Sequence, residues 1–408
     1  MHIDLLKHTI VNVSKSVTFG MKKPDKKFFR TYLESVLEYR TTVLSRLWDT
    51  GKTDAKYLLK YFSRNLGKDS FVDLPNKVFK VLCKLVGELS PDACFCLDSV
   101  DLNKYSAEKM EGLSMVRDGS TGDIVNGYVL NAVSVKWIPV MLEREELEDG
   151  DEGKTTRFDI FSDQIGKICS TFWSGYWILA DRLYDDVKKF NLLIQEKFRF
   201  AIRMKTSRYV TIIAGGEEWI WKRTQISNLP PGVYEVTFPK LTRSCYLTVL
   251  ALPGYKNPIR VLSNENNPRI IEQYLKRWEI ERIFRSWKQE FELEKIGTQS
   301  KRKIDNLIAI VQLCIGISVH MYGKVECEIV EESSLKNIQT KWKAVTGITA
   351  FRKELKKYLK RVSLTFNRNS IIGFIGEYMK KVKKMKYYLR WATLNPTISP
   401  QIRLDFWC

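Results

Sequence analysis

Between residues 92 and 204 the spacing of apolar residues changes several times in a fixed order. Two runs rich in β-branched and aromatic residues, "ACFCLD" and "GYVLNAVSVKWIPVML", provide three strand candidates. They are followed by helical periodicity around "RFDIFSDQIGKICSTFW", a strand "YWILAD", a helix "YDDVKKFNLLIQEK" and a strand "FRFAIRMK". Three strands followed by helix, strand, helix and strand are typical of an α/β domain with a mixed sheet.

The sequence on either side of this pattern predicts further segments. We expect a helical N-terminal region at 1–88 and the first part of the α/β core at 89–204. A β-rich insertion is expected at 205–265, where strand candidates are joined by glycine and proline turns. The second part of the core would occupy 266–325, and a basic helical region 326–408.

The strongly basic balance of the chain indicates a polyanionic partner. Its 67 Lys and Arg against 47 Asp and Glu give a net charge of +20. Nucleic acid is the commonest partner for such a charge, and an anionic membrane surface is the next. The longest apolar run, "LIAIVQLCIGIS", is shorter than the ~20 residues of a spanning helix, and the N-terminus lacks the apolar block of a signal peptide. We therefore expect a cytoplasmic, nucleoid-associated protein with no membrane partner. The helical region at 1–88 is expected to bind DNA, and the region at 326–408 to bind DNA or to mediate dimerisation.

Histidine and cysteine offer little material for a metal or catalytic centre. The chain contains three His, and its eight Cys stand mostly alone with no C-x-x-C pair. A zinc site or a histidine-based active site is therefore disfavoured.

Two aspartates stand at the ends of predicted strands. Asp98 follows "CFCL" and Asp181 follows "WILA". Active sites of α/β proteins are usually built where strands end, although a single Asp there is more often a helix cap or a turn residue. These strands would be the first and the fourth of the core, which are neighbours in a ribonuclease-H-like sheet.

A charged segment later in the chain, "YLKRWEIERIFRSWK" at 274–288, predicts one continuous helix. At about 100° per residue its polar positions Tyr274, Arg277, Glu281 and Lys288 fall in one row. An apolar stripe for packing on a sheet lies beside this row: Ile280, Ile283, Phe284, Trp287 and Phe291. The alternative is an ordinary Arg–Glu pair on a solvated helix, which contributes roughly a few tenths of a kcal/mol.

A glutamate from this helix would complete a cluster of three carboxylates with the two strand-end aspartates. Carboxylates held together repel one another, so such a cluster makes little sense as a stabilising device. It makes sense around Mg²⁺, which prefers oxygen ligands. Two such ions about 3.5–4 Å apart can activate a nucleophile and stabilise the leaving oxygen of a phosphodiester. The sequence therefore suggests metal-dependent cleavage and joining of nucleic-acid strands.

The spacing of Tyr274, Arg277, Glu281 and Lys288 resembles the Y-R-E-K signature of the insertion-sequence-four family of DDE transposases. "LDSVDL" and "LADRLYDD" resemble the first and second aspartate motifs of that family, although the second motif often continues D-R-G-Y or D-R-E. The segment "YSAEKMEGLSMVRDGSTGDIVNGYVL" resembles the stretch that follows the first aspartate. The resemblance covers roughly residues 90 to 320.

The resemblance implies that Asp98, Asp181 and Glu281 bind the metal ions, two Mg²⁺ per active site, for which Mn²⁺ would substitute. Asp101 in "LDSVDL" is an alternative to Asp98. The direction of the strand favours Asp98, because a residue three positions further on would point differently.

The remaining residues of the signature, Tyr274, Arg277 and Lys288, are implied to contact transposon-end DNA near the cleaved phosphate. Arg offers a fork of donors to phosphate and Lys a point charge. Arg203 and Lys205, at the end of the last core strand, are further candidates for contact with the DNA backbone, with solvated charge as the equal alternative.

Two insertion tryptophans and two loop aspartates each allow a second interpretation. Trp219 and Trp221 in "EEWIWKR" share one strand face and could stack on an unpaired base, but strand tryptophans are more often core residues. Asp118 and Asp123 in "RDGSTGD" fit a hairpin turn better than a metal site.

We therefore expect a DNA transposase that performs cut-and-paste transposition, with terminal inverted repeats and target DNA as its partners. Because two ends must be cut and joined together, a homodimer in a synaptic complex is expected, and the resemblance alone suggests a hairpin intermediate. The alternatives are a transposase-derived DNA-binding protein without cleavage and another ribonuclease-H-like nuclease.

Overall fold

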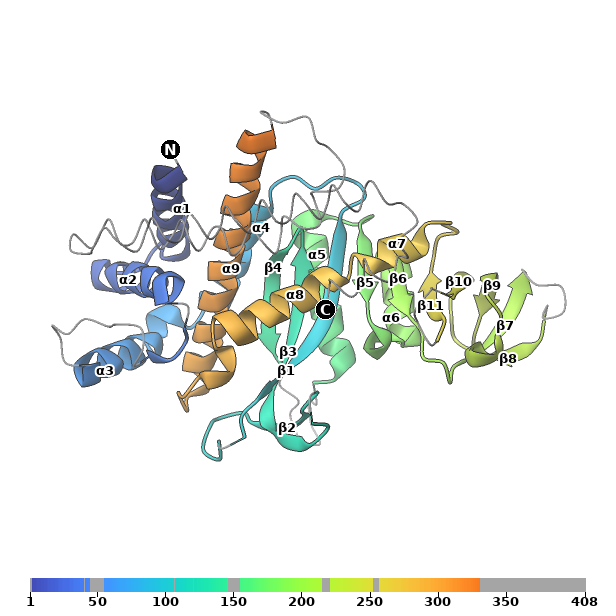
Figure 1. Ribbon diagram of the computed structural model, residues 1–408, viewed down its shortest axis with the longest axis horizontal. Coiled ribbons are helices and arrows are strands. Elements are labelled where there is room, and N and C mark those ends of the chain that lie inside the picture. Colours follow the sequence, from blue (N-terminus) through green and yellow to red (C-terminus); the bar gives the residue numbers. More distant parts are fainter. Residues whose placement is uncertain are drawn as a thin grey trace, which may run out of the picture.

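A computed structural model of the chain describes residues 2–39, 41–44, 55–105, 107–119, 121–145, 155–214, 221–251 and 257–330 (Figure 1). The N-terminal part of these residues is helical, as predicted. It contains α1 (His2–Val17), α2 (Lys23–Tyr39), α3 (Ala55–Leu66) and α4 (Leu74–Val86). A short 3-10 turn, η2 (Asp69–Phe71), joins α3 to α4.

These helices pack on the long helix α9 (Lys301–Val330), and Figure 1 shows them side by side. Aromatic rings fill the space between α2 and its neighbours, with Phe28 5.6 Å from Phe71 and Tyr32 5.0 Å from Phe62 between ring centroids. An apolar 21-residue stretch of α9, Lys301–Met321, is long enough to cross a membrane, but 83% of its most apolar window is buried inside the protein. It packs here as a core helix.

The centre of the molecule is a mixed sheet. Its core strands are β1 (Cys94–Asn103), β3 (Ile124–Val135), β4 (Ile138–Arg144), β5 (Trp177–Ala180) and β6 (Arg199–Arg203). They lie in the order β4-β3-β1-β5-β6. β1, β3 and β4 are antiparallel, whereas β5 runs parallel to both β1 and β6. The predicted order of strands and helices is confirmed, with one additional short strand, β2 (Ser114–Arg117), at the edge of β3.

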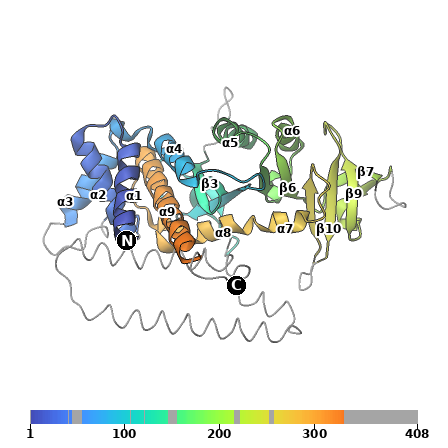
Figure 2. The same ribbon diagram turned by 90° about the horizontal axis from the view of Figure 1, so that it is seen from above.

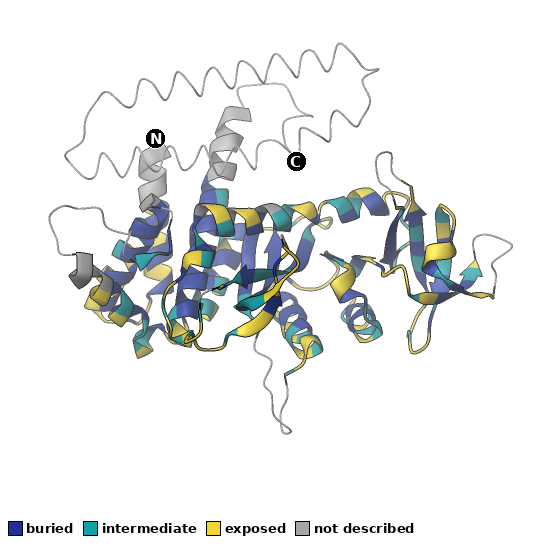
Figure 3. Cartoon of the chain, turned by 60° about the horizontal axis from the view of Figure 1, so that its bottom comes forward, coloured by how far each residue is buried: buried dark blue, intermediate teal, exposed yellow. Residues whose placement is uncertain are grey.

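Helices cover both faces of the core sheet (Figure 2). One face carries α5 (Arg157–Phe172) and α6 (Val187–Gln195). The other carries α7 (Ile270–Leu275) and α8 (Trp278–Arg285). The start of α5 is fixed by a capping box between Thr156 and Asp159, which satisfies backbone donors at that end. Buried residues concentrate in the strands and on the inward sides of these helices (Figure 3).

The predicted β-rich insertion is confirmed, and its strands extend the same sheet. β7 (Tyr209–Ala214), β8 (Arg223–Gln225), β9 (Gly232–Thr237), β10 (Cys245–Leu250) and β11 (Ile259–Ser263) follow β6 in the chain. β11 pairs antiparallel with β6, so the insertion and the core form one continuous set of strands.

The prediction of one continuous helix at 274–288 is wrong. Lys276 and Arg277 form a turn between α7 and α8, in which Arg277 N–H donates to Tyr274 and Ile280 N–H donates to Arg277, three residues back in each case. After α8 the backbone continues as a π-helical turn, η6 (Ser286–Glu290). The apolar stripe is nevertheless confirmed. Its five residues are all buried: Ile280, Ile283, Phe284, Trp287 and Phe291.

Candidate active site

Asp98 and Asp181 lie at the same level of two neighbouring parallel strands. The prediction that Asp98 ends its strand is wrong, because β1 continues to Asn103 and Asp98 lies in its middle, whereas Asp181 directly follows β5. The register of β1 and β5 pairs Leu97 with Ala180, and the next residue on each strand is an aspartate. Adjacent strands lie about 4.8 Å apart, so this register brings Asp98 and Asp181 side by side. Asp181 also accepts a hydrogen bond from Leu183 N–H at 2.8 Å, which starts the short 3-10 turn η3 (Arg182–Tyr184).

Asp98 is a buried carboxylate, only 8% exposed, on β1, which α8 contacts. Its Oδ1 accepts from Ser99 N–H at 2.9 Å, and its Oδ2 accepts from Arg277 at 2.7 Å. Burial raises the pKa of Asp98 to about 7; Arg277 and the Ser99 N–H oppose this rise, and the charges of Asp181 and Glu281 add to it. Asp98 therefore lies within electrostatic reach of the other two predicted metal ligands, Asp181 and Glu281.

Arg277 connects the helix to the strand. Its Nη1 donates to Asp98, its Nη2 donates to Glu281 Oε1 at 2.7 Å, and its Nε donates to the Tyr274 hydroxyl at 3.2 Å. The Arg277 side chain is 4% exposed, and that of Glu281 is 37% exposed. Burial disfavours the charged guanidinium, but Tyr274, Asp98 and Glu281 outweigh it and raise the pKa of Arg277.

The predicted row of four polar residues is therefore only partly assembled. The Arg277 side chain contacts both Tyr274 and Glu281. Lys288 lies apart from them, in the π-helical turn, and pairs with Glu294 Oε1 at 3.0 Å. Tyr274 is 3% exposed, so it and Arg277 lie beneath the surface. Contacts of these two side chains with DNA stay a prediction, and such contacts require them to leave their present partners.

The donor set suits a hard cation, because it consists of carboxylates and a partly desolvated Asp98 would gain from a positive charge. Within the described part of the chain, however, no group of three His, Cys, Asp or Glu side chains forms a ready-made metal site. The guanidinium of Arg277 instead stands between Asp98 and Glu281. The residues fit Mg²⁺ or Mn²⁺ by their chemistry, and binding requires their side chains to rearrange.

Asp101 has different neighbours from Asp98. Burial raises its pKa, while Lys288 and Arg157 lower it and Glu145 raises it further; Asp181 and Glu281 do not contribute. The two loop aspartates lie at a hairpin turn between β2 and β3, where Asp118 N–H donates to the Asp123 carbonyl at 2.8 Å. This confirms their interpretation as turn residues.

The candidate DNA contacts from the insertion side differ in exposure. Arg203 and Lys205 are exposed at and just after the end of β6, and Arg203 lies close enough to lower the pKa of Tyr274, which burial raises. Trp221 is 71% exposed, whereas Trp219 lies outside the described residues.

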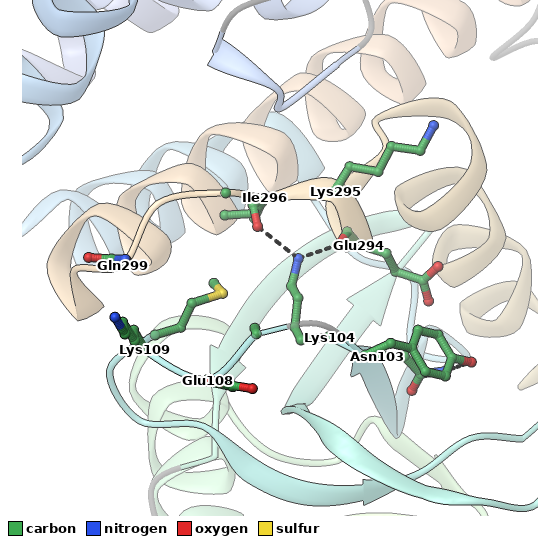
Figure 4. Close-up of a pocket in the computed structure, with 12 residues that line it drawn as sticks. Asn103, Lys104, Glu108, Lys109, Glu294, Lys295, Ile296 and Gln299 are labelled. Carbon is green, nitrogen blue, oxygen red and sulfur yellow. Dashed lines mark hydrogen bonds between the residues drawn. The ribbon is translucent and has the colours of Figure 1, made fainter.

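Sequence reasoning missed two buried side chains that hold distant segments of the chain together. Lys104, just after β1, donates through Nζ to the Leu293 and Ile296 carbonyls at 3.3 and 3.2 Å and also to the Glu294 carbonyl. It lies at a cavity of about 630 Å³ between residues 103–110 and 294–299 (Figure 4). In the sequence, nothing distinguishes Lys104 from the many other Lys and Arg residues.

The other of these two residues is Asp185, whose side chain is fully buried and pairs with Arg208 at 2.5 Å. Its Oδ2 also accepts from Lys205 N–H at 2.8 Å, which fixes the chain after β6 next to the Asp181 turn. The sequence feature that could have pointed to Asp185 is its position in the second aspartate motif, "LADRLYDD".

Residues 142–317 match the family model described as the transposase DDE domain. The matched stretch includes Asp181 and Glu281 and begins after Asp98. No curated protein sequence matches the chain. Among solved structures, the chain is similar to a piggyBac transposase in a cryo-EM synaptic complex with hairpin DNA, with 11% identity, a TM-score of 0.47, and coverage of 86% of this chain and 75% of that one. Residues 142–317 of this chain are therefore similar to a transposase DDE domain.

Proposed function

We propose that the protein is a cut-and-paste transposase of the insertion-sequence-four kind, with Asp98, Asp181 and Glu281 as its catalytic carboxylates. The observation that carries this proposal is the register that puts Leu97 beside Ala180, because it brings the first two carboxylates together. Arg277, in the turn between α7 and α8, then links Asp98 to Glu281.

The topology supports a ribonuclease-H-like core. The order β4-β3-β1-β5-β6, with three antiparallel strands followed by two parallel ones, is the arrangement that such a core requires. The β-rich insertion also falls between the second aspartate and the glutamate, as the family resemblance implies.

The three carboxylates would hold Mg²⁺, or Mn²⁺ in its place. When bound, such ions supply Lewis acids that make water a better nucleophile and stabilise a leaving oxygen. The chain itself orients two of the ligands, since Ser99 N–H holds Asp98 and Leu183 N–H holds Asp181. Preorganised ligands lower the cost of assembling a reactive site.

The proposed reaction has two phosphoryl-transfer steps. Water attacks a phosphodiester at each element end, where one P–O bond forms and another breaks to release a 3′-hydroxyl. That hydroxyl then attacks a phosphodiester of target DNA, again exchanging one P–O bond for another. Since both ends must react together, we propose a homodimer on double-stranded DNA.

A cleavage assay tests this function. DNA carrying the repeats that flank the gene would be incubated with Mg²⁺ and wild-type protein, Asp98→Asn or Asp181→Asn. Asp123→Asn, in the exposed hairpin turn, is the matched control. We expect wild type and the control to cut at the ends, and both active-site variants to bind the ends without cutting.

The outcomes separate the alternative functions. End-specific binding without cutting by the wild type would indicate a DNA-binding protein derived from a transposase. Cutting that ignores the end sequence would indicate a different nuclease. Either result would rule out the proposed transposition reaction.

A further inference from the structure

One buried guanidinium serves two carboxylates that the proposed function assigns to metal binding. Arg277 donates to Asp98 Oδ2 and Glu281 Oε1, both at 2.7 Å, and its side chain is 4% exposed. An arginine in this position carries its charge at every relevant pH. It is therefore a permanent cation inside the carboxylate cluster.

The charges of the cluster explain why a cation belongs there. Asp98 lies within electrostatic reach of both Asp181 and Glu281, and carboxylates this close repel one another. Arg277 offsets this repulsion in the metal-free protein. A divalent cation bound by Asp98 and Glu281 would be repelled by the positive charge of Arg277. It would also need the carboxylate oxygens to which Arg277 now donates hydrogen bonds. Arg277 and a metal ion would therefore compete for the carboxylates of Asp98 and Glu281.

The local backbone suits a residue that changes partners. Arg277 lies in the turn between α7 and α8, where hydrogen bonds span three residues instead of four. The Lys276 carbonyl in this turn accepts from the Cys96 thiol at 3.7 Å. The backbone at Arg277 is therefore held by hydrogen bonds of its own turn and not by those of a regular helix.

We propose that Arg277 is a placeholder cation, which holds Asp98 and Glu281 in the metal-free protein and gives up these carboxylates when a divalent cation binds. Arg277 is thus a positioning residue, and its charge weakens metal binding. This inference rests on the proposed function only in taking Asp98, Asp181 and Glu281 as metal ligands.

Metal binding without DNA provides the test. Mn²⁺ binding to the full chain would be measured by electron paramagnetic resonance for wild type, Arg277→Gln and Arg277→Lys. Gln keeps a hydrogen-bond donor and removes the charge, whereas Lys keeps the charge and loses the fork. Arg285→Gln, at an exposed position on α8, the helix that follows Arg277, is the matched control.

We expect Arg277→Gln to bind Mn²⁺ about tenfold more tightly than wild type, a typical coupling between two sites. Arg277→Lys and Arg285→Gln should stay within about threefold of wild type, a margin that falls below the usual range of such couplings. The melting temperature of Arg277→Gln should be lower than that of wild type in EDTA and should rise more on addition of Mn²⁺. This metal-dependent gain separates competition from a general structural role.

Two results would overturn the inference in different ways. If Asp181→Asn abolishes Mn²⁺ binding but Arg277→Gln leaves it unchanged or weaker, the placeholder role is wrong and the metal-binding carboxylates stand. If Mn²⁺ binding does not depend on Asp181, the inference and the metal chemistry of the proposed function both fail.

Discussion

Asp98 and Asp181 stand side by side because β1 and β5 are parallel and pair Leu97 with Ala180. The two aspartates are held differently. Asp98 is buried against Arg277, whereas Asp181 is partly exposed and caps a 3-10 turn through Leu183 N–H. The hydrogen bond between Asp181 and Leu183 N–H can thus be tested separately from the proposed binding of a metal ion by Asp181.

Substitution of Asp181 should separate these two contributions. Asn keeps an oxygen that can accept from Leu183 N–H, so Asp181→Asn should retain stability and lose cleavage. Asp181→Ala should lose cleavage and also about 1 kcal/mol of unfolding free energy, the usual contribution of one such hydrogen bond. Denaturant unfolding and the end-cleavage assay measure the two effects.

Asp186 provides the control, since it caps α6 through Lys188 N–H at 2.8 Å. Asp186→Ala should lose similar stability relative to Asp186→Asn, and both should still cut. Retention of cleavage by Asp181→Asn would exclude Asp181 from the metal-binding cluster.

Sequence patterns predicted the core strands and put Asp98 and Asp181 on neighbouring strands, because each aspartate follows a short apolar run, "CFCL" or "WILA". They did not predict that β1 continues past Asp98 to Asn103. They did not predict the break at Lys276 and Arg277. Residues 270–290 contain no Gly or Pro, so local sequence gives no reason for a helix to end there. The turn is accompanied by contacts from distant residues, with Cys96 donating to the Lys276 carbonyl and Asp98 accepting from Arg277.

The same limit applies to Lys288 and to the insertion. A regular helical wheel puts Lys288 in line with Glu281, but the π-helical turn changes that angle and Glu294 becomes its partner. The pairing of β11 with β6 joins residues some 60 positions apart, Leu262 with Ile202, and neither strand reveals its partner by composition. The pairing of the insertion with the core is therefore a part of the fold that the sequence did not reveal.

Gly127 is predicted to tolerate no side chain. A Cβ there would lie 2.4 Å from the Leu102 carbonyl oxygen and 2.4 Å from Val116 Cγ2, between β1 and β2. Gly127→Ala should therefore cost roughly 1–3 kcal/mol of unfolding free energy, the usual range for overpacking. Gly166, exposed on α5 with no atom within 4 Å of its Cβ position, is the control.

Gly166→Ala should instead stabilise the protein by up to about 1 kcal/mol, because alanine is the better helix former. Urea unfolding of both variants measures the difference. Equal stability of Gly127→Ala and wild type would show that β1, β2 and β3 do not approach as closely as described.

Lys104 should stabilise the junction between β1 and the segment after α8. Its Nζ serves the Leu293, Glu294 and Ile296 carbonyls, so Lys104→Met should leave buried acceptors unpaired and cost about 1–3 kcal/mol. Unfolding in denaturant at pH 7.5 measures this loss.

The effect of Lys104 should also depend on pH. Burial lowers its pKa to about 8, with the Glu294 carboxylate opposing the change, whereas an unfolded lysine has a pKa near 10.4. Between these values the unfolded chain binds more protons, so the part of the stability that depends on this ionisation is fully present above about pH 10.4 and is lost as the pH falls through about 8. The hydrogen bonds of Nζ still contribute at pH 7.5. The stability difference between wild type and Lys104→Met should therefore widen from pH 7.5 to 9.5. A constant difference would mean that the ammonium has its ordinary pKa.

The exposed cations Arg203 and Lys205 should contribute to DNA affinity through phosphate contacts. Each lies at the end of β6, and Arg203 stands near Tyr274 at the edge of the candidate site. Loss of one phosphate contact should reduce the slope of log affinity against log salt by about 0.9. The double variant with Arg203→Gln and Lys205→Gln should therefore bind more weakly and with a slope smaller by about 1.8, as measured by fluorescence anisotropy between 50 and 200 mM salt. Lys136→Gln, an exposed lysine on the turn between β3 and β4, is the control and should leave this slope unchanged. An unchanged slope in the double variant would mean that Arg203 and Lys205 are solvated charges with no DNA contact.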